Sequence, residues 1–312
     1  MYNTSDFASK RGGFMADKSV VMVTGCSSGF GRLMVETLAR RGHTVIGGMR
    51  DPEGKNAGPF AELKRLTETE KLPLHVVPLD VTSDASTNAA MKKALAVAGR
   101  IDALVNNAGI GCFGITEAFT VDQVTAQFDT NVFGALRMNR AVLPHMRAAG
   151  RGLLIQISTS TARVPMPFMG VYCAAKAAAE MLAEEARYEL APLGIDSTIL
   201  EATLYPTPML QKMTQPADAE RLAGYGPTLG FMGLLGKAQE WMLSTRPDPQ
   251  EVADAVIQLV EAAPGTRPLR TLVGAIHAEG TATLNQTTDS MVGSFYGSMG
   301  VAGLVQLRTD GI

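Results

Sequence analysis

The feature that most constrains the fold is an alternation of short apolar runs with longer helix-like segments along most of the chain. The seven apolar runs expected to be strands are 19–24, 43–49, 74–82, 101–109, 152–158, 195–202 and 269–275. The segments expected to be helices are 30–42, 61–71, 84–98, 121–149, 171–191 and 247–263. Strands that alternate with helices of this length form βαβ units. We therefore expect a doubly wound α/β Rossmann fold, in which helices flank a parallel seven-stranded sheet.

Two segments fall outside this alternation. Residues 1–17 are polar and contain glycine, and they predict a flexible N-terminal leader before a single domain over 18–312. Residues 205–245 are rich in Met, Leu, Gly and Pro without a clean period. A long irregular insertion in a compact domain is typical of a lid or binding loop, here one for the substrate. The alternative is an ordinary pair of helices packed on the domain.

Composition excludes several other classes of protein. The chain has 312 residues, is 46% hydrophobic and carries a net charge of −2, which leaves no basic footprint for nucleic acid. No apolar run approaches the ~18 residues of a membrane span, and no apolar signal core is present, so we expect a cytoplasmic protein. The three cysteines, Cys26, Cys112 and Cys173, are too scattered for a disulfide framework or a tetrahedral metal site. No metal is expected.

The stretch TGCSSGFG, residues 24–31, follows the first expected strand and opens the first expected helix. Its glycines stand at 25, 29 and 31. A first glycine permits a tight turn, and later ones let backbone amides approach a diphosphate at the helix N-terminus. The context predicts a dinucleotide site, with a plain glycine-rich connection as the alternative.

This spacing, GxxxGxG after a threonine, resembles the cofactor motif of the short-chain dehydrogenases/reductases. NNAG at 106–109, LDVT at 79–82 and YCAAK at 172–176 resemble three further motifs of that family. The glycine and YCAAK stretches are most similar to the 17β-hydroxysteroid and retinol dehydrogenase branch. The resemblance implies the following cofactor-binding residues: Thr24, Gly25, Ser27, Ser28, Gly29, Phe30, Gly31, Asp80, Val81, Asn107, Ala108, Gly109, Tyr172, Lys176 and Thr207.

The choice between the two nicotinamide cofactors depends on the end of the second strand. An acidic residue there bonds the adenosine ribose of NAD, whereas an arginine accommodates a 2′-phosphate. By the family's spacing Met49 takes the acidic position and Arg50 follows it, a pattern resembling NADP-preferring members. Asp51, an acidic residue just after Arg50, leaves NAD as the alternative cofactor. We therefore expect NADP(H), with NAD(H) as the alternative.

Tyr172 and Lys176 are four residues apart, so on a helix they lie on one face. Carbonyl reduction requires a hydride, which the cofactor carries, and a proton, which the protein must supply. A nearby ammonium favours phenolate and is expected to lower the pKa of the phenol. By the resemblance, Tyr172 is the general acid/base, and Lys176 also binds the nicotinamide ribose.

Two further catalytic residues follow from the resemblance. The family usually carries a substrate-binding serine thirteen residues before the tyrosine, and that position is Thr159, which offers an equivalent hydroxyl. Ser158, fourteen residues before, is the alternative if a one-residue bulge intervenes. Asn131 matches the asparagine that interrupts a helix and holds a water linking Lys176 to solvent.

The chain departs from the family after the sixth strand. Ala202 and Thr203 stand where Pro-Gly is usual, although Thr207 keeps the position of a threonine that contacts the nicotinamide carboxamide. This change is expected to reshape the nicotinamide pocket.

The sequence thus predicts an NAD(P)(H)-dependent oxidoreductase that interconverts a ketone or aldehyde and an alcohol. The apolar insertion predicts a hydrophobic or aromatic substrate. The alternatives are a non-catalytic NAD(P)-sensing regulatory protein and a nucleotide-sugar epimerase or dehydratase, although the latter normally has a different glycine spacing. Family members associate through two long helices, here 121–149 and 171–191, so a homodimer or homotetramer is expected.

Overall fold

The computed structural model describes residues 18–276 and 278–309. The predicted leader, residues 1–17, lies outside the described residues. Among the residues that are described, no helix is both long and apolar enough to cross a lipid bilayer.

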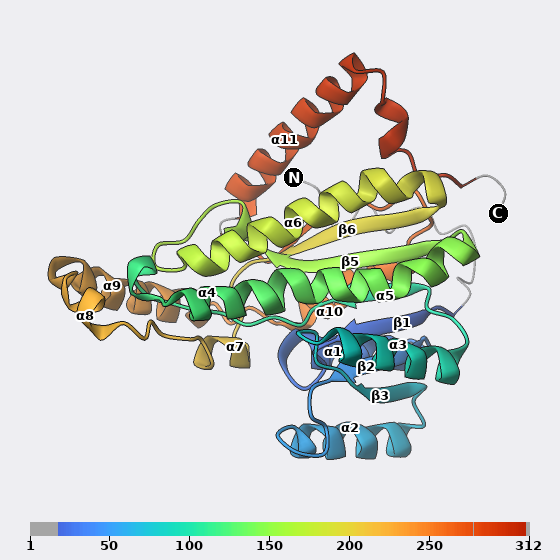
Figure 1. Ribbon diagram of the computed structural model, residues 1–312, viewed down its shortest axis with the longest axis horizontal. Helices are drawn as coiled ribbons and strands as arrows, with labels where there is room; N and C mark the ends of the chain where they lie inside the picture. Colours follow the sequence, from blue (N-terminus) through green and yellow to red (C-terminus); the bar gives the residue numbers. More distant parts are fainter. Residues whose placement is uncertain (1–17, 277, 310–312) are drawn as a thin grey trace.

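Seven parallel strands form one sheet in the order β3-β2-β1-β4-β5-β6-β7 (Figure 1). The strands are β1 (Val20–Thr24), β2 (Thr44–Met49), β3 (Leu74–Pro78), β4 (Ala103–Asn106), β5 (Gly152–Thr159), β6 (Ile195–Ala202) and β7 (Arg270–Val273). The strand order reverses between β1 and β4, which is where doubly wound sheets bind ligands. The prediction of a doubly wound, parallel, seven-stranded sheet is confirmed.

Helices cover both faces of the sheet because successive strand residues point to opposite sides. Val21 and Val23 of β1 enter one core, with side chains of α1 and α10. Val20 and Met22 enter the other, with side chains of α3 and α5. The helices around the sheet are α1 (Gly29–Arg40), α2 (Ala57–Glu70), α3 (Asp84–Ala98), α4 (Val121–Phe128), α5 (Gly134–Ala149), α6 (Gly170–Leu190) and α10 (Gln250–Glu261).

The helix predicted over 121–149 is interrupted. A π-helical turn, η3 (Asp129–Phe133), joins α4 to α5, and Asn131 lies at its centre. The side-chain amide of Asn131 donates to the carbonyl oxygens of Gln127, at 3.0 Å, and of Ile110, at 2.9 Å. The expectation of one continuous helix is therefore wrong, whereas the interruption at Asn131 that the resemblance implied is present, since a side chain that bonds backbone groups opens the regular turn.

The segment between β6 and α10 forms three helices rather than irregular chain. They are α7 (Pro208–Gln211), α8 (Ala219–Ala223) and α9 (Gly226–Ser244). Figure 1 shows them beyond the carboxyl ends of the strands. A further helix, α11 (Ala278–Ser298), follows β7 and was not expected from the sequence. Only Thr281 and Asn285 are buried on α11, so it has little of the apolar stripe that reveals a helix.

Candidate active site

The turn between β1 and α1 depends on close backbone contacts. Gly29 has a φ of 56°, in the left-handed region that favours glycine. A Cβ added at Gly31 would lie 2.2 Å from the carbonyl oxygen of Gly25 and 2.6 Å from Nδ2 of Asn107. Gly31 therefore excludes a side chain, and the φ of Gly29 disfavours one. The N-terminus of α1 consequently presents its backbone amides to a cavity of about 870 Å³ that also reaches Tyr172. This arrangement fits the diphosphate of a dinucleotide.

Thr24 holds the neighbouring strand end in place. Its Oγ1 accepts hydrogen bonds from the backbone amides of Asn107, at 3.0 Å, and Ala108, at 2.9 Å. In return, Nδ2 of Asn107 donates to the carbonyl oxygen of Thr24 at 2.8 Å. Thr24 is buried and does not line the cavity, so it supports the turn from behind, and its cofactor contact stays a prediction.

The end of the cavity formed by β2 and β3 carries two cations and one carboxylate. It is lined by Arg50, Lys55, Asn56, Asp80 and Val81. Asp80 accepts hydrogen bonds from the backbone amide of Thr82, at 3.0 Å, and from its hydroxyl, at 2.7 Å. Burial opposes ionisation of Asp80, but these hydrogen bonds and the charge of Arg50 hold its pKa below the ordinary value.

Asp51 is the residue that left NAD(H) as the alternative cofactor, and its side chain bonds within its own loop. Its Oδ2 accepts a hydrogen bond from the backbone amide of Lys55 at 2.7 Å. Asp51 does not line the cavity, whereas the neighbouring Arg50 does. The two charged residues after β2 therefore face different surroundings.

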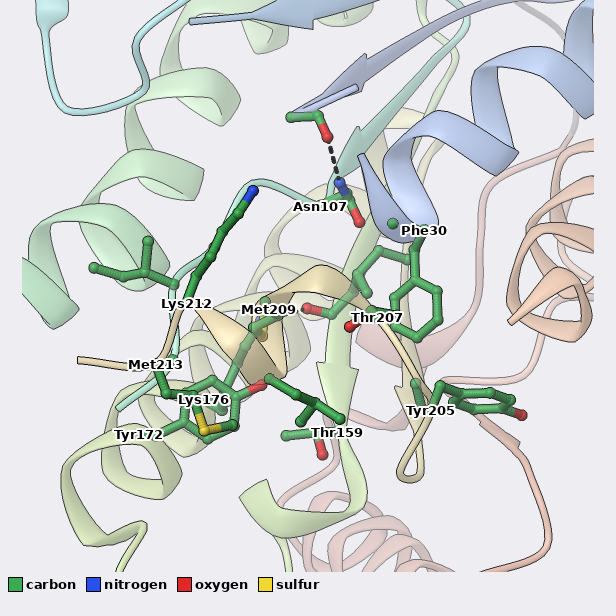
Figure 2. A pocket seen from close by; sticks show the side chains of 18 of the residues that line it. Phe30, Asn107, Thr159, Tyr172, Lys176, Tyr205, Thr207, Met209, Lys212 and Met213 are labelled. Carbon is green, nitrogen blue, oxygen red and sulfur yellow. Dashed lines mark hydrogen bonds between the residues drawn. The ribbon is translucent and has the colours of Figure 1, made fainter. Parts of the chain in front are cut away.

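Tyr172 and Lys176 lie one turn apart near the start of α6, and both are buried. Nζ of Lys176 donates to the carbonyl oxygen of Ile157 at 3.0 Å. The same nitrogen lies 6.0 Å from the centroid of the Tyr172 ring. Among the residues described, none forms a hydrogen bond with the Tyr172 hydroxyl, which belongs to the cavity lining. Figure 2 shows Tyr172, Lys176 and Thr159 grouped at one end of the cavity.

Burial dominates the ionisation of this pair. It lowers the pKa of Lys176 to about 8, although the nearby Glu180 carboxylate acts in the opposite direction. Burial, with smaller contributions from the thiols of Cys173 and Cys112, raises the pKa of Tyr172 above its ordinary value. The expectation that Lys176 lowers the pKa of the phenol is therefore wrong for this arrangement. An ammonium 6.0 Å from the ring centroid does not offset the loss of water around the phenol.

Ser158 and Thr159 are consecutive residues of β5 and have different partners. The hydroxyl of Ser158 donates to the carboxylate of Glu180 on α6. Oγ1 of Thr159 makes local contacts with Thr161, accepting from its backbone amide at 3.3 Å and lying 3.3 Å from its hydroxyl oxygen. Both residues line the cavity. The Ser158 hydroxyl is therefore engaged by a charged group, while that of Thr159 is available for exchange with a ligand.

Asn131 lies behind the cavity wall rather than in it. Its Oδ1 accepts from the backbone amide of Ile110 at 3.2 Å. A Cβ added at Gly109 would lie 2.7 Å from that oxygen and 3.7 Å from Nζ of Lys176. Asn131 thus reaches the Lys176 side of the site from the rear. The water that it is expected to hold stays a prediction.

The structure brings the predicted residues together around one cavity of about 870 Å³. All of the predicted site residues except Thr24 and Asn131 line it. Thr207 faces the glycine turn, since a Cβ added at Gly29 would lie 3.7 Å from its Cβ. Figure 2 shows Thr207 beside Phe30, away from Tyr172.

Sequence reasoning missed much of the remaining wall. Its apolar part includes Phe113, Met166, Met169, Met209, Met213 and Trp241. The polar additions are Lys55, Asn56 and Lys212. The apolar composition of 205–245 signalled Met209, Met213 and Trp241 only as a group. Nothing in the sequence pattern signalled Ile276 and Thr281, which reach the cavity from beyond β7.

Comparison with known proteins gives a family match. The sequence profile described as short chain dehydrogenase matches residues 19–218. The uncharacterized oxidoreductase YusZ of Bacillus subtilis is 33% identical over 78% of this chain and 85% of its own length. Estradiol 17-beta-dehydrogenase 1 of Rattus norvegicus is 32% identical over 79% of this chain and 71% of its own. Retinol dehydrogenase 8 of Bos taurus is 31% identical over 80% of each chain.

Solved structures agree. A short-chain dehydrogenase from Streptomyces avermitilis is 30% identical, with a TM-score of 0.68 over 91% of this chain and 98% of its own. A gluconate 5-dehydrogenase from Burkholderia cenocepacia, in complex with NADP and tartrate, is 25% identical. Its TM-score is 0.67 over 82% of this chain and 93% of its own.

Glu180 provides a test of the buried site through pH. Burial, followed by repulsion from Glu201, raises the pKa of Glu180 from 4.5 to about 7. The folded protein then holds this proton more tightly than the unfolded chain does. The resulting stabilisation is complete below pH 4.5 and is lost as the pH rises through about 7. Glu180→Gln cannot titrate, so its stability relative to wild type should rise by about 3 kcal/mol across this range, at 1.36 kcal/mol per pH unit.

Urea denaturation at a series of pH values measures this difference. Glu189→Gln, at an exposed position on the same helix, is the matched control and should follow the wild-type profile. Parallel stability profiles for wild type and Glu180→Gln would contradict the raised pKa of Glu180.

Proposed function

This chain belongs to the short chain dehydrogenase family of oxidoreductases, and we propose that it interconverts a hydrophobic ketone or aldehyde and the corresponding alcohol with NADP(H). One observation carries the proposal. The hydroxyl of Tyr172 opens into a cavity that has the glycine turn at one end and an apolar wall at the other. A bound nicotinamide supplies or accepts the hydride. The protein must then manage only the proton and the position of the reacting oxygen.

Each site residue has a defined part in that task. In the reducing direction, Tyr172 donates its proton to the carbonyl oxygen as the hydride reaches the carbon, and in the oxidising direction it accepts the proton. Lys176, which also lines the cavity, is assigned to the nicotinamide ribose, as the family resemblance implies. Thr159 donates a hydrogen bond to the reacting oxygen and fixes its position. We assign this part to Thr159 because the Ser158 hydroxyl is already bonded to Glu180.

The cations after β2 support NADP(H) rather than NAD(H). Arg50 and Lys55 line the end of the cavity at β2 and β3, where the family's spacing puts the adenosine ribose. A guanidinium binds a phosphate through two parallel hydrogen bonds. Asp51, the residue that would bond the NAD ribose, is occupied by the backbone amide of Lys55.

The wall opposite the glycine turn supports an apolar substrate. It includes four methionines and two aromatic residues: Met166, Met169, Met209, Met213, Phe113 and Trp241. Methionine side chains adapt to ligands of different shape. The curated relatives named for estradiol and retinol act on molecules of this kind by their names. We therefore propose a bulky apolar carbonyl compound as the substrate class.

We also propose that the enzyme forms a homodimer or homotetramer through the helices around η3 and α6. Four large apolar side chains are exposed there: Phe133, Leu136, Met181 and Leu182. Association would remove this surface from water. Sedimentation should give two or four times the mass of one chain, and Leu182→Glu should lower it. A wild-type monomer that persists at micromolar concentration would contradict the proposal.

A cytoplasmic location stays a prediction, which cell fractionation would test. The three buried free cysteines support it, because free thiols persist in reducing compartments.

Replacing Tyr172 by Phe tests the reaction itself. The variant loses the proton donor while keeping the ring, so turnover should fall about 10³-fold. Cofactor affinity should change by less than about twofold, since the hydroxyl is not needed to hold the diphosphate. Oxidation of NADPH with a panel of aliphatic, aromatic and steroidal ketones measures turnover. Energy transfer from Trp241, the single tryptophan, to bound NADPH measures affinity.

Tyr225→Phe is the matched control, because Tyr225 does not line the cavity and its hydroxyl bonds Glu117. The turnover of Tyr225→Phe should equal that of wild type. Unchanged turnover in Tyr172→Phe would refute the acid/base assignment.

Replacing Arg50 by Ala tests the cofactor preference. A charged hydrogen bond to phosphate contributes about 1.5–3 kcal/mol, so the Kd for NADPH should rise roughly 10- to 100-fold. The Kd for NADH, which lacks the 2′-phosphate, should change by less than about threefold. Arg65→Ala, at an exposed position on α2, should leave both unchanged. Equal weakening of both cofactors in Arg50→Ala would exclude the phosphate contact.

A further inference from the structure

The loop that follows β5 is bonded to helix α11, more than a hundred residues further along the chain. Nε of Arg163 donates to Oδ1 of Asn285 at 3.0 Å. Nη2 of Arg163 donates to Oγ1 of Thr288 at 2.9 Å. Asn285 and Thr288 are three residues apart, so they lie on one face of α11. The guanidinium therefore spans two acceptors on one helix.

Asn285 passes this connection on to the sheet. Its Nδ2 donates to Oε2 of Glu201 at 2.5 Å, and both residues are buried. A guanidinium can only donate and a carboxylate accepts, so the amide has a single orientation that satisfies both neighbours. Glu201 is in β6, next to Ala202 and Thr203 of the cavity wall. The Arg163–Asn285–Glu201 chain thus joins two edges of the cavity.

A second arginine holds the same helix. Nη1 of Arg270, on β7, lies 2.7 Å from Oδ1 of Asp289 on α11, and its Nη2 is paired with Glu184 on α6. Nε of Arg270 lies 3.6 Å from Oε1 of Glu201. With α11 anchored through Arg270, the helix is a firm support for the contact that Arg163 makes.

The start of the loop packs against α6, and Thr159 pairs with Ala202 of β6, but the loop's own hydrogen bonds are local. Thr159 is four residues before Arg163, and the bonds between them are short-range. The amide of Thr161 donates to Oγ1 of Thr159 at 3.3 Å, and that of Arg163 donates to the carbonyl oxygen of Ser160 at 3.1 Å. Neither bond connects the loop to another element. The bonds of Arg163 to α11 do so.

We infer that Arg163 is a positioning residue for the reaction: it ties the loop to α11 and thereby sets where the Thr159 hydroxyl lies relative to Tyr172. The inference rests on the proposed function, because it assigns Thr159 to the substrate oxygen. A displacement of about 1 Å in a positioning group can lower turnover about a hundredfold. Thr281 and Ile276, from the same C-terminal part of the chain, line the cavity directly. The segment after β7 is therefore part of the active site rather than an appendage.

Arg163→Ala, Arg163→Lys and Thr288→Val test the inference. Arg163→Ala should lower kcat roughly 30- to 100-fold while the Kd for NADPH changes less than about twofold. Arg163→Lys keeps the charge but not the fork, so it should recover part of the loss. Thr288→Val removes one of the two acceptors of Arg163, so its kcat should lie between those of wild type and Arg163→Ala. Thr287→Val is the matched control, because its hydroxyl bonds only the carbonyl oxygen of Thr283 on the same helix.

Hydrogen exchange gives a readout that is independent of turnover. Amides of residues 160–164 should exchange at least about tenfold faster in Arg163→Ala, with β5 and α6 protected as in wild type. Wild-type turnover or unchanged loop exchange in Arg163→Ala would overturn the inference. An equal loss of kcat in Arg163→Ala and Arg163→Lys, together with faster hydrogen exchange throughout the protein, would overturn it as well. If wild type reduces no carbonyl compound while loop exchange responds as expected, the proposed reaction fails and the tie to α11 stands.

Discussion

The ammonium of Lys176 is buried, and its hydrogen bond to the carbonyl oxygen of Ile157 joins α6 to β5 near the middle of the sheet. A charge removed from water requires such a partner, so the helix cannot slide along the strand without losing it. Tyr172 lies one turn before Lys176, and Thr159 lies two residues beyond Ile157. This bond therefore ties the helix that carries Tyr172, the proposed proton donor, to the strand that carries Thr159, the proposed substrate-positioning residue.

Backbone groups form one end of the cavity, and side chains form the other. At the glycine turn, backbone groups approach so closely that Gly31 admits no side chain, and Thr24 bonds the amides that follow β4. At the other end, methionine and aromatic side chains form the wall. A diphosphate has the same shape in every dinucleotide, so a rigid backbone cradle suits it. Side chains that can change conformation are better suited to bind an apolar substrate of variable shape. The reacting groups lie between the rigid and the adaptable part.

This division explains what could be predicted from the sequence. The fold follows from apolar strands alternating with helices, and the cofactor end follows from glycines whose spacing reflects backbone geometry. The family resemblance implied an interruption at Asn131, but its π-helical form could not be foreseen, because it depends on a carbonyl group of Ile110 that only the folded chain brings near. The raised pKa of Tyr172 likewise results from burial by distant segments. Strand alternation alone gave no ground to prefer Thr159 over Ser158, since the bond that engages the Ser158 hydroxyl comes from Glu180 on α6.

The C-terminal helix α11 was missed for a related reason. Its buried residues are the polar Thr281 and Asn285, and its contacts with the rest of the protein combine hydrogen bonds with the edge-to-face packing of Tyr296 on Tyr188 of α6. Buried ionic networks often add little to stability compared with well-packed apolar residues, because removing charges from water is costly. They differ from apolar contacts in being directional. An Asn285 amide between a guanidinium and a carboxylate accepts one arrangement only. A network of this kind behind Thr159 suits a site that must hold a hydroxyl in one place, and an apolar contact would permit the loop to shift.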